Sequence, residues 1–122
     1  MHIVNWVRGR ARSFRFAFRG IATMLATQHN AWIHAAAVVA VVTAGLAFGI
    51  ERVEWLAITL AIVAVWVAEA LNTAFETLCD VASPDFHPLV ERAKDVAAGA
   101  VLISAIGAVV VAALIFGPRL VP

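Results

Sequence analysis

Three long apolar runs separated by short polar stretches dominate the hydrophobic pattern of this chain. No Asp, Glu, Lys or Arg occurs between Arg19 and Glu51, and residues 31–50 form the first apolar run. A run of about 20 apolar residues is long enough to cross the hydrocarbon core of a bilayer as a helix. Within it, Gly45 and Gly49 form a GxxxG pair, which indicates either a close helix contact or, at Gly49, the end of the helix. The pattern predicts a first membrane-spanning helix here.

The second apolar run, residues 53–82, differs at its two ends. It begins after a short polar break and stays apolar from Leu56 to Ala68 apart from Thr59. Polar side chains then recur at steps of three and four residues, which places them on one face of one helix. These are Glu69, Asn72, Glu76 and Asp80. Ser83 precedes a proline and therefore predicts the end of the helix, because a residue before proline avoids the helical region.

A third run follows a polar link that we expect over residues 83–92. Residues 96–116 carry no charge and predict a third span, with Lys94 and Asp95 at its start. The Gly117–Pro118 pair after it is expected to stop the helix. We find no repeats and no low-complexity tract, and we expect residues 1–122 to form a single domain.

An amphipathic segment, residues 3–21, precedes the first span. Its apolar residues recur at spacings typical of one helix face, and arginines recur beside them: Ile3, Val7, Phe14, Phe18 and Ile21, then Arg8, Arg12, Arg15 and Arg19. This pattern favours a helix lying in the membrane interface, the alternative being an ordinary solvated helix. We therefore predict an all-α integral membrane protein with three transmembrane helices preceded by an N-terminal amphipathic surface helix.

Composition and charge agree with this fold. The chain is 63% hydrophobic and 14% charged, which is more apolar surface than a soluble domain of 122 residues could cover. Five arginines and no acidic residue lie in the first 19 positions, which predicts that this end stays in the cytoplasm. Nucleic-acid binding is not expected, because nothing else in the chain is basic or suited to reading bases.

This topology gathers polar residues at the cytoplasmic ends of the spans. Glu69 lies about 16 residues beyond the start of the second span, or roughly 24 Å at 1.5 Å per residue. That depth is near the inner edge of a hydrocarbon core about 30 Å thick. Residues from three parts of the chain are expected at the same level: Gln28, His29 and Asn30; Asn72, Glu76 and Asp80; Lys94 and Asp95.

An ionisable group at membrane depth indicates a function by default, although the carboxylates could instead pair with Lys94 or a neighbouring subunit as a structural contact. Carboxylates beside the single lysine of the chain suit phosphoryl transfer assisted by Mg²⁺. Glu69 could then act as the base for a lipid hydroxyl. There is no GxxxxGK[ST] loop and no GxGxxG after a strand, so an ATP site here would be of an unusual kind.

At these residues the sequence resembles the prokaryotic diacylglycerol kinase family. Glu69-Ala-Leu-Asn72-Thr73-Ala-Phe-Glu76, followed by Asp80, is similar to the signature E-x-x-N-[TS]-A-x-E-x-x-x-D. His87-Pro-Leu, Ala93-Lys94-Asp95 and residues 98–102 match its second half. The resemblance implies a small trimeric enzyme of the bacterial cytoplasmic membrane. It would move the γ-phosphate of MgATP onto a lipid hydroxyl, with sites that face the cytoplasm and are shared between subunits.

The resemblance also implies roles for single residues. Glu69 would be the catalytic base, Glu76 would hold Mg²⁺, and three residues would position the nucleotide phosphates: Asn72, Lys94 and Asp95. Phe86 and His87 stand where the family contacts the nucleotide base, although His87 could equally be an exposed interfacial histidine. Many members carry a second Mg²⁺-binding glutamate where this chain has Gln28, which adds no charge.

The resemblance leaves the lipid substrate open between diacylglycerol and undecaprenol. His87-Pro-Leu together with residues 95–102 looks more like the undecaprenol branch, and we favour that lipid. The alternative function is a small membrane transporter or a non-catalytic membrane subunit. Small multidrug transporters also carry an intramembrane glutamate, but they have four spans and their glutamate lies near the midplane.

Overall fold

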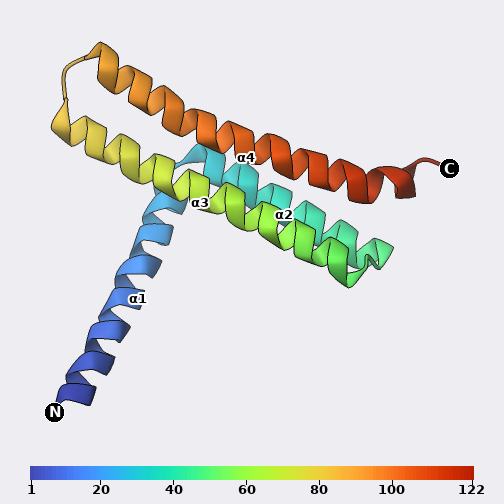
Figure 1. Cartoon of the computed structure of the whole chain (residues 1–122), viewed down its shortest axis with the longest axis horizontal. Helices are drawn as coiled ribbons and strands as arrows, with labels where there is room; N and C mark the ends of the chain where they lie inside the picture. Colours follow the sequence, from blue (N-terminus) through green and yellow to red (C-terminus); the bar gives the residue numbers. More distant parts are fainter.

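The computed structural model describes the whole chain, Met1 to Pro122, and it consists of four α-helices. They are α1 (His2–Thr27), α2 (His29–Phe48), α3 (Arg52–Ala82) and α4 (Pro88–Leu120). The last three lie side by side in alternating directions, whereas α1 leaves the bundle at a steep angle (Figure 1). Each of α2, α3 and α4 is long and apolar enough to cross a membrane. The predicted architecture of three spanning helices after an N-terminal helix is therefore confirmed.

The first two helices are separated by one residue. Helix α1 continues six residues beyond the predicted end at residue 21, and the helical backbone breaks at Gln28 (φ −111°, ψ 118°). Helix α2 ends at Gly49, whose φ of 60° is a left-handed conformation that glycine adopts without a steric penalty. Gly49 is therefore the helix end, and Gly45 is the close contact. A Cβ atom on Gly45 would lie 2.6 Å from Cη2 of Trp55 in α3.

Helix α3 starts at Arg52, one residue before the predicted span 53–82, and ends where the sequence predicts. A capping box starts it, in which the backbone N–H of Glu51 donates to Oε2 of Glu54 at 2.9 Å. The helix ends at Ala82, directly before the Ser83–Pro84 pair, as expected for a residue that precedes proline.

Two predictions for α4 are wrong. The helix begins at Pro88, so the polar link is shorter than 83–92, because His87 accepts a hydrogen bond from the backbone of Leu89 and proline at the first position favours a helix start. The Gly117–Pro118 pair does not stop the helix, which continues to Leu120. Proline removes one helical hydrogen bond, and here the loss falls in the last turn, where Arg119 donates to the carbonyl of Ile115 at 2.6 Å.

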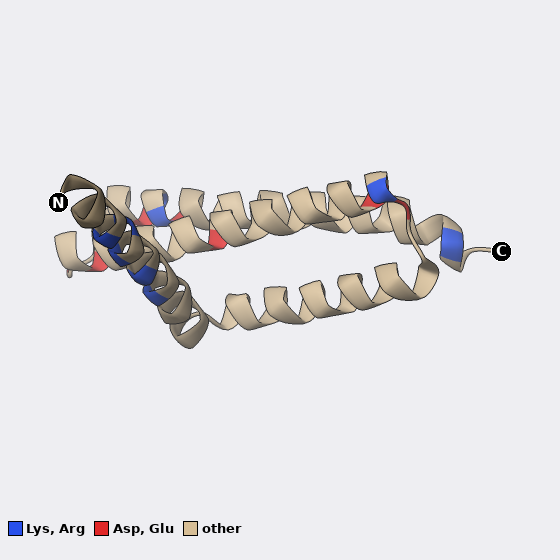
Figure 2. Ribbon diagram, turned by 90° about the horizontal axis from the view of Figure 1, so that it is seen from below, with Lys and Arg blue, Asp and Glu red and all other residues tan.

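The bundle has a near end, where α1 joins α2 and residues 83–87 join α3 to α4, and a far end, where residues 49–51 join α2 to α3 and α4 terminates. Arginines run along α1, and the other charged residues lie nearer one end of the bundle or the other, while α2 carries none (Figure 2). Only 12 of 122 residues are buried, so most apolar side chains face outward, as expected for helices surrounded by lipid or by other subunits. The buried apolar cluster of Ile50, Ile58 and Ile115 lies at the far end.

Candidate functional site

The predicted polar stripe on α3 starts inside the bundle. Glu69 is fully buried, with 0% of its surface exposed, and Asn72 and Thr73 beside it are 6% and 8% exposed. Thr73 is satisfied, because its hydroxyl donates to the carbonyl of Glu69 at 2.9 Å. Both carboxylate oxygens of Glu69 and Oδ1 of Asn72 have no hydrogen-bond partner. Such groups are normally paired when buried, and unpaired ones often mark a place where a ligand completes the structure.

His34 is the side chain that approaches Glu69, and the sequence analysis did not identify it. Its Nε2 lies 3.4 Å from Oε2 of Glu69 and is also without a hydrogen bond. The imidazole packs edge-on against Trp66, with ring centroids 6.2 Å apart and planes at 68°. A signal was available in the sequence, since a histidine stands near the start of an apolar run that must pack against the polar end of the next helix.

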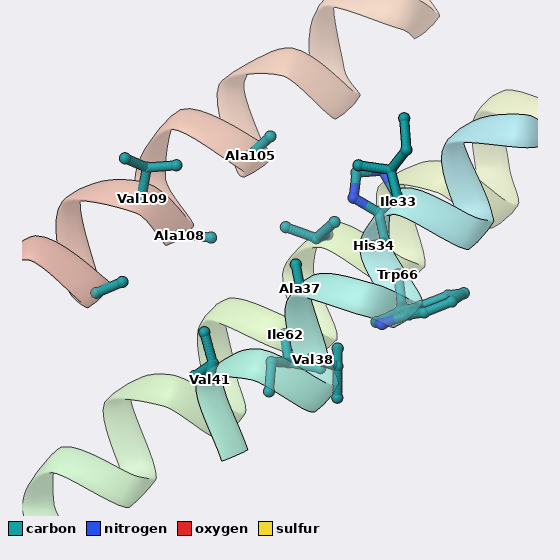
Figure 3. A pocket seen from close by; sticks show the side chains of 12 residues that line it. Ile33, His34, Ala37, Val38, Val41, Ile62, Trp66, Ala105, Ala108 and Val109 are labelled. Atoms are coloured by element: carbon teal, nitrogen blue, oxygen red, sulfur yellow. The ribbon is translucent and has the colours of Figure 1, made fainter. Parts of the chain in front are cut away.

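A groove of about 290 Å³ opens next to this pair, between α2, α3 and α4. Figure 3 shows its lining: Ile33, His34, Ala37, Val38 and Val41 of α2, Ile62 and Trp66 of α3, and Ala105, Ala108 and Val109 of α4. Eleven of its twelve lining residues are hydrophobic, and His34 is the exception. The groove is therefore an apolar surface with its polar edge beside Glu69.

A second, polar cavity of about 260 Å³ lies where α3, the 83–87 link and α4 meet. It is lined by Phe86, His87, Lys94 and Asp80, among others. The ammonium group of Lys94 donates to Oδ1 of Asp80 at 2.7 Å, which joins the two helices close to the link. Three of the predicted nucleotide-binding residues are therefore brought together around one cavity.

His87 and Phe86 have different environments in this cavity. Nδ1 of His87 accepts a hydrogen bond from the backbone N–H of Leu89 at 3.1 Å, so this side chain caps α4. The sequence alone did not predict this structural role for His87. Because the hydrogen bond uses Nδ1, the Nε2 atom of the exposed ring remains available. Phe86 is 77% exposed, like many large apolar side chains of the single chain, so its ring is free to contact a ligand, lipid or another subunit.

The remaining predicted site residues are not joined to the others within one chain. Glu76 is half-buried on α3 between the two regions, Gln28 is half-buried at the joint of α1 and α2, and Asp95 is exposed on α4. None of the three side chains makes a hydrogen bond or an ion pair. The structure also contains no group of three or more His, Cys, Asp or Glu side chains arranged to hold a metal ion.

The near end thus combines two chemical environments on one helix. A buried carboxylate beside an apolar groove, separated from it by His34, can accept a proton from a polar group carried by a hydrocarbon chain. Eleven residues further along α3, or about 16 Å at 1.5 Å per residue, Asp80 borders a polar cavity in which Lys94 is the cation and Asp85 and Glu91 are further carboxylates. Asn72 and Glu76 lie between them on the same helix.

Comparison with known proteins gives consistent matches. Residues 15–116 match the family model described as prokaryotic diacylglycerol kinase. The chain is 40% identical over 109 residues to an undecaprenol kinase of Bacillus subtilis, covering 89% of both proteins. It is also 40% identical over 109 residues to a diacylglycerol kinase of Synechocystis, covering 88% of this chain and 62% of that protein. The matches do not favour the alternative of a transporter or a non-catalytic subunit.

Proposed function

Because the chain belongs to the prokaryotic diacylglycerol kinase family and is a lipid kinase, we propose that it transfers the γ-phosphate of ATP to the hydroxyl group of undecaprenol. The observation that carries this proposal is the fully buried carboxylate of Glu69, which has no hydrogen-bond partner and lies 3.4 Å from His34, a residue that lines an apolar groove. A lipid alcohol matches both features, since it has one hydroxyl to donate and a hydrocarbon chain to bury.

In the proposed reaction, Glu69 is the catalytic base. Its carboxylate accepts the proton of the lipid hydroxyl while the hydroxyl oxygen forms a bond to the γ-phosphorus of ATP. The bond between that phosphorus and the oxygen bridging to the β-phosphate breaks, and ADP leaves with the electron pair. Phosphoryl transfer needs mainly alignment and charge stabilisation, so a positioned carboxylate and a nearby cation are the protein's main contributions.

The nucleotide would bind along the polar part of α3 and the start of α4. Lys94 supplies the cation for the phosphates, and Asp80 holds its ammonium group at 2.7 Å. Asn72 and Asp95 complete the network around the phosphates. The exposed ring of Phe86 and the free Nε2 of His87 border the same cavity and are available to the nucleotide base.

The donor set at the near end is compatible with Mg²⁺. This ion takes one or two protein carboxylates together with phosphate oxygens and water, so it does not need three protein ligands in one chain. Glu76 would be the charged ligand, and Gln28 would contribute a neutral carbonyl oxygen. When bound, Mg²⁺ neutralises charge on the transferring phosphates.

We also propose that the enzyme is a homotrimer in the bacterial cytoplasmic membrane, with its sites facing the cytoplasm. Two observations support an oligomer. Most large apolar side chains are exposed in the single chain, and Glu76, Gln28 and Asp95 lack partners that a neighbouring subunit could supply. The arginines of α1 support the cytoplasmic orientation, because such residues remain on that side of the membrane.

The test is an assay of phosphoryl transfer with purified protein in detergent–lipid micelles, supplied with undecaprenol or diacylglycerol at equal mole fraction. We expect ATP consumption to require a lipid alcohol, and kcat/KM to be higher for undecaprenol. A higher kcat/KM for diacylglycerol would reverse the substrate assignment but keep the lipid kinase activity. ATP consumption at the same rate without a lipid alcohol would contradict the proposed reaction.

A further inference from the structure

His34 and Glu69 are placed as each other's nearest polar partners. The Nε2 atom of His34 and the Oε2 atom of Glu69 are 3.4 Å apart, and neither atom makes a hydrogen bond. The side chain of His34 is 15% exposed and that of Glu69 is 0% exposed. A displacement of a few tenths of an ångström would bring the two atoms into hydrogen-bonding range, and contacts of this kind often tighten only when substrate binds.

Few polar side chains surround this pair, and the other one beside Glu69 is Asn72, which is 6% exposed and whose Oδ1 makes no hydrogen bond. Trp66 packs edge-on against the imidazole, and the groove beside it is lined otherwise by hydrophobic side chains. Thr73, the closest hydroxyl along α3, is already committed to the backbone carbonyl of Glu69. A carboxylate in an apolar environment without a donor is unfavourable, and the imidazole of His34 is the group from a neighbouring helix that lies within 3.4 Å of it.

We propose that His34 is a positioning residue for the catalytic base, and this inference rests on the proposed function of Glu69. In this arrangement, the N–H at Nε2 of His34 donates to Oε2 of Glu69. That hydrogen bond fixes the rotation of the carboxylate and leaves Oε1 to accept the proton of the lipid hydroxyl. His34 contacts neither ATP nor the reacting phosphorus, so it acts on the rate through Glu69 alone.

The kinetic test replaces His34 by leucine, which keeps the volume and removes the donor, and by glutamine, whose amide N–H can replace Nε2. We expect His34→Leu to lower kcat by about 10- to 100-fold, the range for misplacing a catalytic group, with the KM values for ATP and lipid unchanged. His34→Gln should keep most of the wild-type kcat. His2→Leu is the control, since it removes an exposed histidine from the start of α1.

A double substitution separates an action through Glu69 from an independent one. If His34 works through the carboxylate, adding His34→Leu to Glu69→Gln should lower the residual rate no further, measured with radiolabelled ATP. Wild-type kcat in His34→Leu would overturn the proposal. The proposal would also be overturned if His34→Leu lowered the rate of the Glu69→Gln variant by the same factor as it lowers the rate of the wild type.

A measurement without turnover tests the contact itself. The chain has four histidines, so selective ¹⁵N labelling of their rings gives a small set of NMR signals. Glu69→Gln should shift the ring nitrogen signals of His34, whereas Glu51→Gln, at the far end, should leave all four histidines unchanged. Unshifted His34 signals would overturn the proposal even if His34→Leu failed to fold. If the wild-type protein does not phosphorylate lipid, the proposed function is contradicted. The NMR result is independent of that outcome, because it reports only on the contact between His34 and Glu69.

Discussion

The two ends of the helical bundle differ in the hydrogen bonding of their glutamates. At the far end, Glu54 accepts two hydrogen bonds from the guanidinium of Arg119, both at 2.9 Å, and a third from the backbone of Glu51. At the near end, Glu69 is more deeply buried, and neither of its oxygens has a partner.

A buried polar group without a partner lowers stability, whereas a paired one contributes or is neutral. The difference therefore indicates that the far-end carboxylate is committed to a contact between α3 and α4, while the near end keeps reactive groups without such a commitment. Substitutions at the near end should change activity with little loss of stability, and substitutions at the far end should do the reverse.

The largest expected effect is at Glu69. Removing a general base typically lowers the rate by about 10²- to 10⁴-fold, so Glu69→Gln should reduce kcat in that range. Because the native carboxylate is unpaired, Glu69→Leu should raise the thermal midpoint of unfolding while abolishing activity. Rates and melting curves of both variants check this, and Glu51→Gln, which changes a glutamate of the α3 capping box at the far end, is the control for the rates alone. A Glu69→Leu protein that melts well below the wild type would show that the carboxylate stabilises the near end.

The next effect is at Lys94, in the polar cavity of the near end. Removing a cation that stabilises phosphate charge should lower kcat/KM for ATP by about 10²-fold, so Lys94→Met should do so without loss of helix content. Initial rates over a range of ATP concentrations give this value. Arg92→Met removes a neighbouring exposed cation of α4 that does not line the cavity, and it should behave as wild type. Equal losses of kcat/KM in Lys94→Met and Arg92→Met would indicate a general effect of net charge and not a specific role of Lys94.

At the far end, Gly45 should affect stability and not chemistry. A Cβ atom there would lie 2.6 Å and 2.9 Å from two atoms of the Trp55 ring, so the indole would have to move. Overpacking of this kind typically costs about 1–3 kcal/mol, and Gly45→Val should lower the unfolding free energy by that amount. Gly107→Val is the control, because nothing lies within 4 Å of its added Cβ. The unfolding free energy of both variants is measured by denaturation in detergent, and kcat is measured alongside it. A lower unfolding free energy with an unchanged kcat in Gly45→Val would support the contrast between the two ends.

Substitutions at Gln28, at the near end, should change the affinity for Mg²⁺, with a smaller effect than those described above. Mg²⁺ affinity rises with the number of carboxylate ligands, so Gln28→Glu should lower the Mg²⁺ concentration that gives half-maximal rate. Gln28→Ala should raise it modestly, whereas Glu76→Gln should be nearly inactive. A Mg²⁺ titration at saturating ATP compares the three variants. Equal damage from Gln28→Ala and Glu76→Gln would make Gln28 a primary ligand.

The smallest effect is expected at the ion pair of the far end. Arg119→Gln removes the paired hydrogen bonds to Glu54, whose side chain is 24% exposed, and partly exposed pairs contribute little. The thermal midpoint should fall slightly, and kcat should not change. The double variant Glu54→Gln/Arg119→Gln should melt close to either single variant if the two residues act as a pair. A large loss of activity in Arg119→Gln would break the distinction between the ends.

Much of the fold was predictable because it depends on local pattern. Apolar run length identified α2 and the start of α3, and Pro84 identified the end of α3. The polar link predicted over 83–92 is too long, because His87 caps α4 and Pro88 starts it. The prediction at Pro118 was also wrong, because a proline in the last turn removes only one hydrogen bond and does not end the helix.

The candidate site was predictable only in part. The spacing of Glu69, Asn72 and Glu76 was evident along one helix, where residues three and four apart share a face. The family resemblance added the residues around His87 and Lys94. His34 was missed because its partner lies on another helix. Glu76, Gln28 and Asp95 remain assigned by resemblance, since the single chain gives them no partners.

The sequence by itself determined which segments cross the membrane and which face of α3 is polar, because hydrophobic length and helical period are properties of neighbouring residues. Only the tertiary structure decided which distant groups meet. Arg119 reaches Glu54 across 65 positions, Lys94 reaches Asp80 across 14, and His34 approaches Glu69 from another helix. It also decided that Glu54 accepts three hydrogen bonds and Glu69 accepts none, because that depends on the rotation and offset of packed helices, which no local pattern specifies.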